Sequence, residues 1–532
     1  ANGIYTYSYG PSSSTTINNL GDIKSRTTDP RGYAYGIDSR SFGNNNAIEI
    51  VSSGNMDVTG AFQAVGIQAW SRFYGTPYTN APISITNHGD IVVEATRKIG
   101  ERFNYAIGIL TISENRGSPV TIVNTGSVFA KGGPRNVGIY SISPYFNNKT
   151  TIFNSGDISA ESYLAIDVKG AGTAHIFNAG TITGFVDLTD QDDMFFNQSG
   201  GVFETKKTSL FGDGNDLFVN QTGGVIQAAT DASKRERSGF RGLETFKNSG
   251  GTISLIDWGV GDKFTIANNP GDKDLRFEGG GYLAVDAELR GPGSQADNFI
   301  VDGDVTGQTK VMVNNTSTQP GVLNTQGIPV VFVDGKTPSE GNFVLANGPI
   351  DTGFFDYDLF FTPTGSGFWE LRSFVNGSAH ALPGLLTAAQ DMWHESSATW
   401  FDRTADLRVV LNGGYAPAYD DGSKSLGEPA ANGLTPGAWL KVGGSYLERD
   451  GSARTSAFGR SYQYDLDNEL TTIDLQMGLD GGAYDVLSQG DALIFGVLGG
   501  FIGGNLDYDS LNDRFSFSGG QVGAYATYLK DG

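Results

Sequence analysis

The chain has 532 residues, enough for several domains, with 76 glycines, 18 prolines and no cysteine. Hydrophobic residues make up 38% and charged residues 18%, which excludes a disordered chain. The formal net charge of −22 disfavours nucleic acid and anionic lipid as partners of the surface. The absence of cysteine excludes disulfides, thiol catalysis and cysteine-bound metals.

There is no signal peptide at Ala1 and no run of 18 apolar residues. The sequence begins and ends within its own patterns, so we expect it to be a fragment of a longer protein.

A short Asn-x-Gly motif flanked by aliphatic residues recurs in the first half of the chain. The five clearest copies are Asn19–Gly21, Asn87–Gly89, Asn124–Gly126, Asn154–Gly156 and Asn178–Gly180. Weaker copies are Ser52–Gly54, Asn197–Gly200, Asn220–Gly223 and Asn248–Gly250. The glycines are 20 to 37 residues apart, which indicates one structural unit with loops of changing length.

Each copy reads as strand, turn and strand. Ile17 and Ile23, or Ile85 and Ile91, alternate with polar residues and should point inward on either side of the turn. Glycine tolerates a positive φ, and asparagine can bond its own backbone, so Asn-x-Gly supplies the turn. One such unit cannot bury its apolar face alone, whereas stacked copies can.

The fold class is therefore all-β, and residues 1–275 are predicted to form a right-handed parallel β-helix, with the hand taken from the crossover rule. Ile85, Ile122, Ile152 and Ile176 should form one inward ladder. A second apolar face is expected from the steps Gly36-Ile37, Gly66-Ile67, Gly108-Ile109 and Gly138-Ile139. An internal aromatic ladder is expected from Phe153, Phe177, Phe196, Phe218 and Phe246.

Residues 276–372 keep the strand pattern but lose the Asn-x-Gly motif. Three segments in this region, Ala296–Gly307, Gly327–Val333 and Phe355–Leu371, resemble the conserved C-terminal module of pertactin-like autotransporter passengers. The resemblance implies a type V autotransporter, and implies that this module caps the β-helix and nucleates its folding. A generic solenoid end-cap is the alternative, and the two interpretations are compatible.

Residues 373–413 contain the long helical stretch, with Pro383 suited to its first turn and Gly413 to its end. Its charged residues cannot face lipid; they are Asp391, Glu395, Asp402, Arg403 and Arg408. A helix of roughly 40 Å fits the inside of a wide barrel, whereas an amphipathic surface helix is the alternative. Because the helix lies in sequence between a cap and a barrel, we favour a place inside the barrel pore over a surface position.

Residues 414–532 are predicted to form the N-terminal part of an outer-membrane β-barrel. The set Leu440, Val442, Phe495 and Phe501 should face lipid, with polar residues on the other face. About four or five strands fit before Gly532, so we expect an open sheet with an unpaired edge.

The search for chemistry assigns no catalytic, cofactor-binding or metal-binding residue. The four histidines His88, His175, His380 and His394 lack partners at metal-binding spacing. Asp351-Thr352-Gly353 matches an aspartic-protease triplet by letters only.

Two acidic motifs, Asp190–Asp193 and Gly212–Phe218, are expected to be solvated turns. The alternative is that they bind calcium. With Lys206, Lys207 and Lys234–Arg237 nearby, a polysaccharide lyase site is a second alternative.

The sequence thus predicts an autotransporter that secretes and displays its own β-helical passenger, without catalysis and without a cofactor. The passenger would act as an adhesin or virulence-type surface protein through the loops 74–80, 144–148 and 231–240. The implied location is the outer membrane and cell surface of a Gram-negative bacterium. Expected partners are membrane lipid, the barrel-assembly machinery and a host or matrix surface, with no nucleic acid. The alternatives are a β-helical carbohydrate-active enzyme and a structural stalk for a further N-terminal domain.

Overall fold

The computed structural model describes residues 1–72, 80–96, 105–133, 135–271, 274–336, 338–364, 366–411, 437–489, 491–511 and 513–530. The chain divides into two compact units. The first contains Ala1–Thr352 and Tyr357–Ser373, and the second contains Gly353–Asp356 and Phe374–Gly532.

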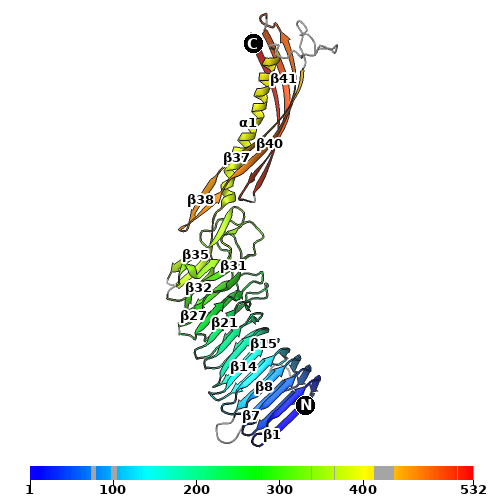
Figure 1. Ribbon diagram of the computed structural model, residues 1–532, viewed down its shortest axis with the longest axis vertical. Coiled ribbons are helices and arrows are strands. Elements are labelled where there is room, and N and C mark those ends of the chain that lie inside the picture. Colours follow the sequence, from blue (N-terminus) through cyan, green and yellow to red (C-terminus); the bar gives the residue numbers. More distant parts are fainter. Residues whose placement is uncertain are drawn as a thin grey trace. The chain divides into compact units, whose positions relative to one another are not determined.

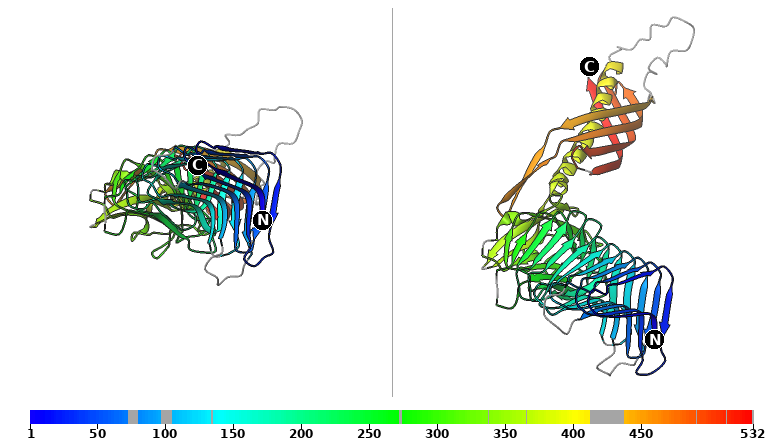
Figure 2. Two further views of the ribbon diagram at one scale, coloured as in Figure 1. Left: turned by 90° about the horizontal axis from the view of Figure 1, so that it is seen from below. Right: turned by 60° about the horizontal axis from the view of Figure 1, so that its bottom comes forward.

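The first unit is a stack of parallel coils with three strands in each turn (Figures 1 and 2). The first face consists of β2 (Thr15–Asn19), β5 (Ile48–Ser52), β8 (Ile83–Asn87), β11 (Val120–Asn124), β14 (Lys149–Asn154), β16 (Thr173–Asn178), β18 (Met194–Asn197), β21 (Leu217–Gln221), β24 (Thr245–Ser249), β27 (Arg276–Glu278) and β30 (Asp304–Thr306). The second face consists of β3 (Ile23–Arg26), β6 (Met56–Gly60), β9 (Ile91–Ala95), β12 (Ser127–Lys131), β15 (Asp157–Gly170), β17 (Thr181–Asp187), β19 (Val202–Thr205), β22 (Val225–Gln227), β25 (Thr252–Ser254), β28 (Tyr282–Ala287), β31 (Thr309–Asn315) and β33 (Phe343–Leu345).

The third face consists of β1 (Asn2–Tyr9), β4 (Tyr33–Phe42), β7 (Gln63–Arg72), β10 (Tyr105–Glu114), β13 (Arg135–Ser143), β20 (Thr208–Leu210), β23 (Arg237–Arg241), β26 (Lys263–Ala267), β29 (Asn298–Asp302) and β32 (Ile328–Val333). The long strands β15 and β17 take part in both the second and the third face. The fold is therefore the β-helix that the repeat predicts.

The Asn-x-Gly turns connect the first face to the second and stack directly on one another. Asn87, Asn124 and Asn154 each donate from Nδ2 to the carbonyl of the turn glycine two residues on, at 2.7–2.9 Å. The same amide groups also bond from coil to coil. This asparagine ladder runs through Asn87, Asn124, Asn154, Asn178, Asn197, Asn220 and Asn248, with 2.9–3.1 Å between Nδ2 and the next Oδ1.

The aliphatic core follows the predicted register. Ile85, Ile122, Ile152 and Ile176 pair in sequence across β8, β11, β14 and β16, and all four are fully buried. The Gly-Ile steps line the third face in the same way, because Ile37, Ile67, Ile109 and Ile139 are paired and fully buried. The glycine before each isoleucine is crowded: a Cβ on Gly108 would lie 2.1 Å from a methyl group of Val128. Both inward ladders are confirmed.

The expected aromatic ladder is wrong as a single internal column. Phe153 is 42% exposed and stacks on Phe177, which stacks on Phe196, so these three rings form an outer ladder. The inner column instead continues Ile176 with Phe195, Phe218, Phe246 and Phe277, all fully buried. The prediction merged two columns that are one residue apart, and a shift of one residue moves a strand side chain to the opposite face.

Parallel pairing continues beyond residue 275, through β26–β29, β28–β31 and β31–β33. The loss of the Asn-x-Gly motif therefore does not end the coil. The pattern changes where β36 (Ser366–Val375) pairs antiparallel with β32. Trp369 of β36 is fully buried against Phe343 and Phe361, and it covers the last coil. The remaining elements of this region are η1 (Glu340–Asn342), β34 (Ile350–Asp351) and β35 (Phe355–Thr364).

In the second unit, α1 (Gly377–Leu411) begins six residues before the expected start at Pro383, which lies inside the helix. The side chain of Asn376 accepts a hydrogen bond from the backbone N–H of Ala379 at 3.2 Å, and this N-cap sets the start. The side chains of Arg403 and Arg408 lie outside the described residues. None of the described helices has both the length and the apolar character needed to cross a membrane.

Four long antiparallel strands accompany the helix, in the order β37 (Gly437–Arg449), β40 (Asn468–Tyr484), β41 (Asp491–Tyr508) and β42 (Arg514–Lys530). A hairpin of β38 (Ser452–Ala457) and β39 (Arg460–Asp465) lies between the first two in sequence. Among the described residues the sheet is open, and β42 pairs on one edge only, as expected.

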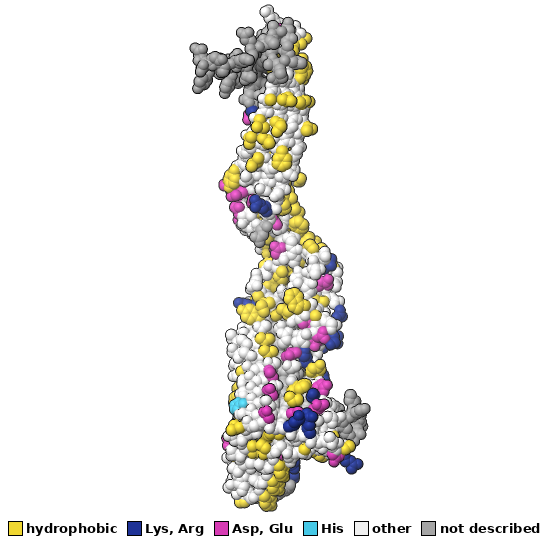
Figure 3. Space-filling model, turned by 90° about the vertical axis from the view of Figure 1, so that its right-hand side faces the viewer, with side chains coloured by type: hydrophobic (Ala, Val, Ile, Leu, Met, Phe, Trp, Pro, Cys, Tyr) yellow, Lys and Arg dark blue, Asp and Glu magenta, His cyan; other side chains and the backbone are white. Residues whose placement is uncertain are grey.

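The two faces of this sheet differ in polarity. Apolar side chains on one face are exposed and gather over it in Figure 3; they include Leu440, Val442, Ile473, Leu479, Phe495, Val497, Phe501 and Val522. On the other face Asp474 and Gln476 are buried beneath α1. There the amide of Gln476 donates to the carbonyl of Ser396 at 2.7 Å, and Arg449 forms an ion pair with Asp391. The helix therefore covers the polar face.

A pair of neighbouring substitutions checks the corrected register. Ile152→Ala should lower the free energy of unfolding by roughly 2–5 kcal/mol, because it opens a cavity in the inward ladder. Phe153→Ala removes a larger side chain but should cost at most about 1.5 kcal/mol, because the ring stacks on the outside. Urea titration followed by circular dichroism measures both. A larger loss for Phe153→Ala would contradict the register.

The asparagine ladder can be tested at Asn154. Replacing Asn154 with alanine removes its bonds to Gly156 and Asn178 and leaves buried groups of the turn without partners. We expect a loss of roughly 1–3 kcal/mol in the free energy of unfolding. Ser155→Ala in the same turn, whose side chain is exposed, is the matched control and should change stability little. Equal effects of the two variants would show that the ladder adds nothing to stability.

Candidate functional site

The two acidic motifs lie on neighbouring coils at equivalent positions. Asp193 directly precedes β18 and Asp216 directly precedes β21, and these two strands are paired one coil apart. Both side chains are buried, with 0% and 1% of their surface exposed. The prediction of solvated turns is therefore wrong for these two residues.

Each buried carboxyl group holds the backbone of its own or the preceding coil. Asp193 accepts hydrogen bonds from the N–H groups of Ala174 at 2.6 Å and Thr189 at 2.8 Å. Asp216 accepts from the N–H of Asp193 at 2.6 Å, and its own N–H donates to Glu244 at 2.7 Å. A calcium ion would have to displace these donors. The described residues contain no group of three or more His, Asp or Glu side chains placed to hold a metal ion.

Burial raises the pKa of Asp193 to about 7 and that of Asp216 to about 9, although the N–H donors act in the opposite direction. The neighbouring carboxyl groups of Asp193 and Glu244 raise the pKa of Asp216 further. Oδ2 of Asp216 has no hydrogen-bond partner among the described residues, which suits a carboxyl group that keeps its proton.

The structure contains a second acidic column that the sequence did not predict. Asp262 directly precedes β26, Asp297 directly precedes β29, and both are buried. Asp297 accepts from the N–H groups of Asp262 at 3.0 Å and Asp286 at 2.8 Å. Burial raises the pKa of Asp262 to about 6 and that of Asp297 to about 8. A signal was present, because an acidic residue stands immediately before a short apolar strand in each case.

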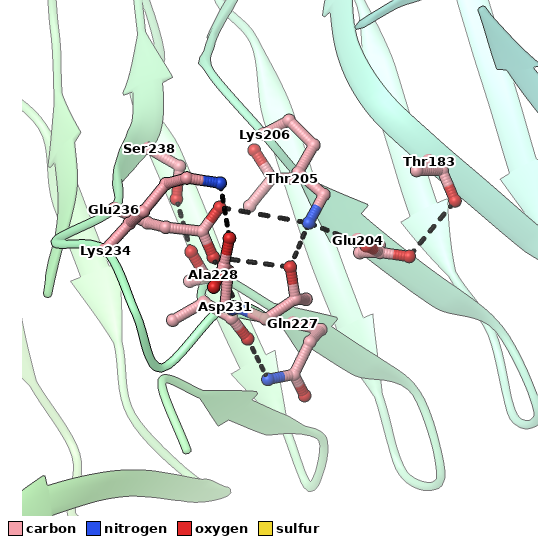
Figure 4. Close-up of polar contacts among 12 residues, drawn as sticks. Thr183, Glu204, Thr205, Lys206, Gln227, Ala228, Asp231, Lys234, Glu236 and Ser238 are labelled. Atoms are coloured by element: carbon pink, nitrogen blue, oxygen red, sulfur yellow. Dashed lines mark hydrogen bonds and ion pairs between the residues drawn. The ribbon is translucent and has the colours of Figure 1, made fainter. Parts of the chain in front are cut away.

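Two of the candidate basic residues, Lys206 and Lys234, form a charged network with neighbouring acids (Figure 4). The ammonium group of Lys206 lies 2.8 Å from a carboxylate oxygen of Glu204 and 3.9 Å from Glu236, and it also bonds Thr230. Glu236 in turn accepts from the N–H groups of Thr230 and Asp231 at 2.5 and 3.2 Å. Lys234 pairs with Asp231 at 2.5 Å.

This network holds the loop at 228–238 in place. The hydroxyl of Ser238 donates to the carbonyl of Ala228 at 3.1 Å. Outside the loop, the ammonium group of Lys207 lies 5.5 Å from the ring centroids of Tyr163 and Phe185. Because Lys206 bonds Glu204, Glu236 and the hydroxyl of Thr230, and Glu236 binds backbone N–H groups, the network is arranged for holding the loop. It gives the lyase alternative no support.

The other candidate positions are structural where they are described. In the loop 144–148, Asn148 is buried and accepts from the N–H of Ser118 at 2.9 Å. His88 lies in a turn and bonds Thr125 at 2.8 Å, and burial lowers the pKa of His175. Of the loop 74–80, residues 74–79 lie outside the described residues.

The chain thus combines, in sequence order, a parallel β-helix, a closing antiparallel strand pair, a helix with one polar sheet face, and an apolar outward sheet face. These features define a parallel β-helix closed by an antiparallel strand pair, followed by an open sheet with one exposed apolar face and one polar face.

Comparison with known proteins agrees with this class. The family described as Autochaperone Domain Type 1 matches residues 263–359. The chain is 34% identical over 130 residues to the probable autotransporter YfaL of Escherichia coli (strain K12), which covers 24% of this chain and 10% of that protein. It is 25% identical over 275 residues to the uncharacterized protein YdeU of the same organism, which covers 47% of this chain and 53% of that protein.

The chain therefore spans between a tenth and about half of the length of these curated relatives. The autochaperone match and the autotransporter relative support a type V autotransporter passenger. That family implies an outer-membrane and cell-surface location in a Gram-negative bacterium.

The raised pKa of Asp216 predicts how stability depends on pH. The folded chain keeps this proton up to a pH of about 9, whereas the unfolded chain loses it near the ordinary value of 3.8. The stabilisation is thus fully present below 3.8 and is lost as the pH rises through about 9. Asp216→Asn, which resembles the protonated form, should make the free energy of unfolding less dependent on pH between about 6 and 9.

The matched control is Asp190→Asn, because Asp190 is exposed and lies in the neighbouring acidic motif. Urea titrations at a series of pH values measure the slope for each variant. A slope left unchanged by Asp216→Asn would contradict the raised pKa.

Proposed function

We propose that this chain carries a surface-displayed β-helical passenger together with the first strands of the outer-membrane barrel that exports it. One observation carries the proposal: in the C-terminal sheet the exposed face is apolar, whereas the face against α1 is polar. Lipid-facing and lumen-facing residues alternate in the strands of such barrels. The helix would then occupy the lumen, and further strands would pair with the open edges of the sheet.

We further propose that the displayed passenger is an adhesin that contacts a host cell or matrix through its loops and outer faces. The barrel would meet membrane lipid and the barrel-assembly machinery. A stalk function for a further N-terminal domain is compatible with the same coil. The enzyme alternative is not favoured, because the acids and Lys206 of the candidate site are already engaged in structural contacts.

The membrane proposal is tested by two substitutions to arginine in the intact protein, expressed in Gram-negative cells. Val497 is 58% exposed on the apolar face, and Val497→Arg should cost roughly 2–4 kcal/mol if it faces the bilayer core. The matched control, Thr527→Arg, places the same charge on the polar face, where Thr527 is half-buried. The amount of heat-modifiable barrel in outer-membrane fractions is the measurement. Equal assembly of both variants would overturn the membrane assignment.

Surface display has its own readout. Protease added to intact cells should cleave the passenger, and detergent should be needed to extract the remaining C-terminal part. A passenger that is cut only after cell lysis would contradict display.

We propose that the cap formed around β32 and β36 starts the folding of the coil; the autochaperone match at residues 263–359 includes β32 and ends before β36. Trp369→Ala should remove roughly 3–5 kcal/mol of packing and slow refolding of the passenger. Phe153→Ala, an aromatic truncation far from the cap in the coil, should leave the refolding rate nearly unchanged. Far-ultraviolet circular dichroism, which follows the backbone, measures the refolding rate of each variant. Equal rates for wild type and Trp369→Ala would refute the folding role.

A further inference from the structure

The outer surface of the third face carries a small group of basic side chains with no acidic partner. Arg237 and Arg241 of β23 and Lys263 of β26 have no carboxylate within 4.0 Å among the described residues. Elsewhere on the passenger, basic side chains such as Lys24, Lys131 and Lys247 form ion pairs. In a chain with a net charge of −22, these three cations on adjacent strands form a local basic cluster.

The register places these cations around a shallow hollow. Arg237 pairs with Lys263, and Gly239 pairs with Thr208 on one side and Thr265 on the other. Ser238 and Phe240 are buried, so the alternation turns Arg237 and Arg241 outward. A Cβ on Gly239 would lie 2.2 Å from the carbonyl oxygen of Thr265, so this position must stay without a side chain. The resulting hollow has a volume of about 330 Å³.

A second hollow of about 270 Å³ follows on the next coils and shares Lys263 with the first. Arg235, Gln295, Asn298 and Phe332 are among the residues that line it. The guanidinium group of Arg235 is held by the side-chain oxygen of Gln295 at 2.7 Å. We call the two hollows together the basic groove.

We propose that the basic groove binds a linear polysaccharide that carries carboxylate or sulfate groups. Three features fit this ligand: cations for its anionic groups, threonine hydroxyl and asparagine amide groups for its hydroxyls, and the half-exposed ring of Phe332 for stacking. Two hollows that share one cation suit a chain of repeating units. Duplex DNA is a less suitable ligand. It carries about one negative charge per 1.7 Å, so the acidic chain repels it more strongly than a polysaccharide whose charges are farther apart.

This inference rests on the proposed surface display, since only a displayed groove would meet such a polymer. Their tests are separate, because display is read by protease on cells and binding is read on the purified chain. A failure of binding would leave display untouched.

The binding test uses the intact chain in detergent micelles with heparin, alginate, neutral dextran and duplex DNA as probes. Heparin carries sulfate and carboxylate, whereas alginate carries carboxylate alone, so the pair distinguishes the two anions. We expect heparin or alginate to bind with an affinity that falls with added salt, and dextran not to bind. The triple variant Arg237→Gln, Arg241→Gln, Lys263→Gln should bind roughly tenfold or more weakly.

The matched control removes the same charge from paired cations, as Lys24→Gln, Lys131→Gln, Lys247→Gln, and should change affinity less than about twofold. Circular dichroism of both variants checks that they are folded. The proposal is overturned if no polysaccharide binds, if the control loses as much affinity as the groove variant, or if DNA binds as tightly through the same residues. Self-association of the chain that disappears in the groove variant would likewise overturn it, because the occupant would then be a second copy.

Discussion

The register of the coils between β8 and β24 depends on the stacked turns and their asparagine ladder. A Cβ on Gly126 would lie 2.1 Å from the carbonyl oxygen of Gly89, so successive turn backbones lie in direct contact. The amide of Asn124 satisfies a turn carbonyl of its own coil and an asparagine of the next coil at the same time. Since a slip of one residue would break these bonds and move every inward side chain outward, the ladder fixes which residues form the core.

The acidic column of Asp193 and Asp216 lies at the opposite end of the ladder strands β18 and β21. Asp193 and Asp216 stand four residues before the ladder residues Asn197 and Asn220. In an earlier coil, the equivalent position before Asn178 is occupied by the buried Ala174. The carboxyl groups accept from backbone N–H groups that the irregular connections leave free. Because burial disfavours the charged form of each carboxyl group, the pKa values of Asp193 and Asp216 rise, and the coil gains a pH dependence that an apolar strand start would not have.

The sequence contains the repeat, so the inward position of Ile152 and the turn role of Asn154 could be derived from it. The aromatic column could not, because Phe195 and Phe196 are adjacent and either could continue the ladder. Only the pairing of Phe195 with Ile176 decides between them. The start of α1 was missed for a different reason: Pro383 is a common first-turn residue, but the amide of Asn376 caps the helix earlier. The acids of the site looked solvated because a single motif does not show which backbone donors a neighbouring coil supplies.

Stability and recognition are separated in this molecule by the alternation of its strands. Inward positions, turn amides and buried carboxyl groups fix the coil, and the charged network at Lys206 fixes the loop beside it. Outward side chains on the same strands contribute little to the stability of the coil, so they can vary without unfolding the chain. Equivalent outward positions on neighbouring coils are about 4.8 Å apart. Side chains at these positions therefore form columns along the coil. A column of cations such as Arg237 above Lys263 therefore matches an elongated ligand with repeated charges better than a compact one.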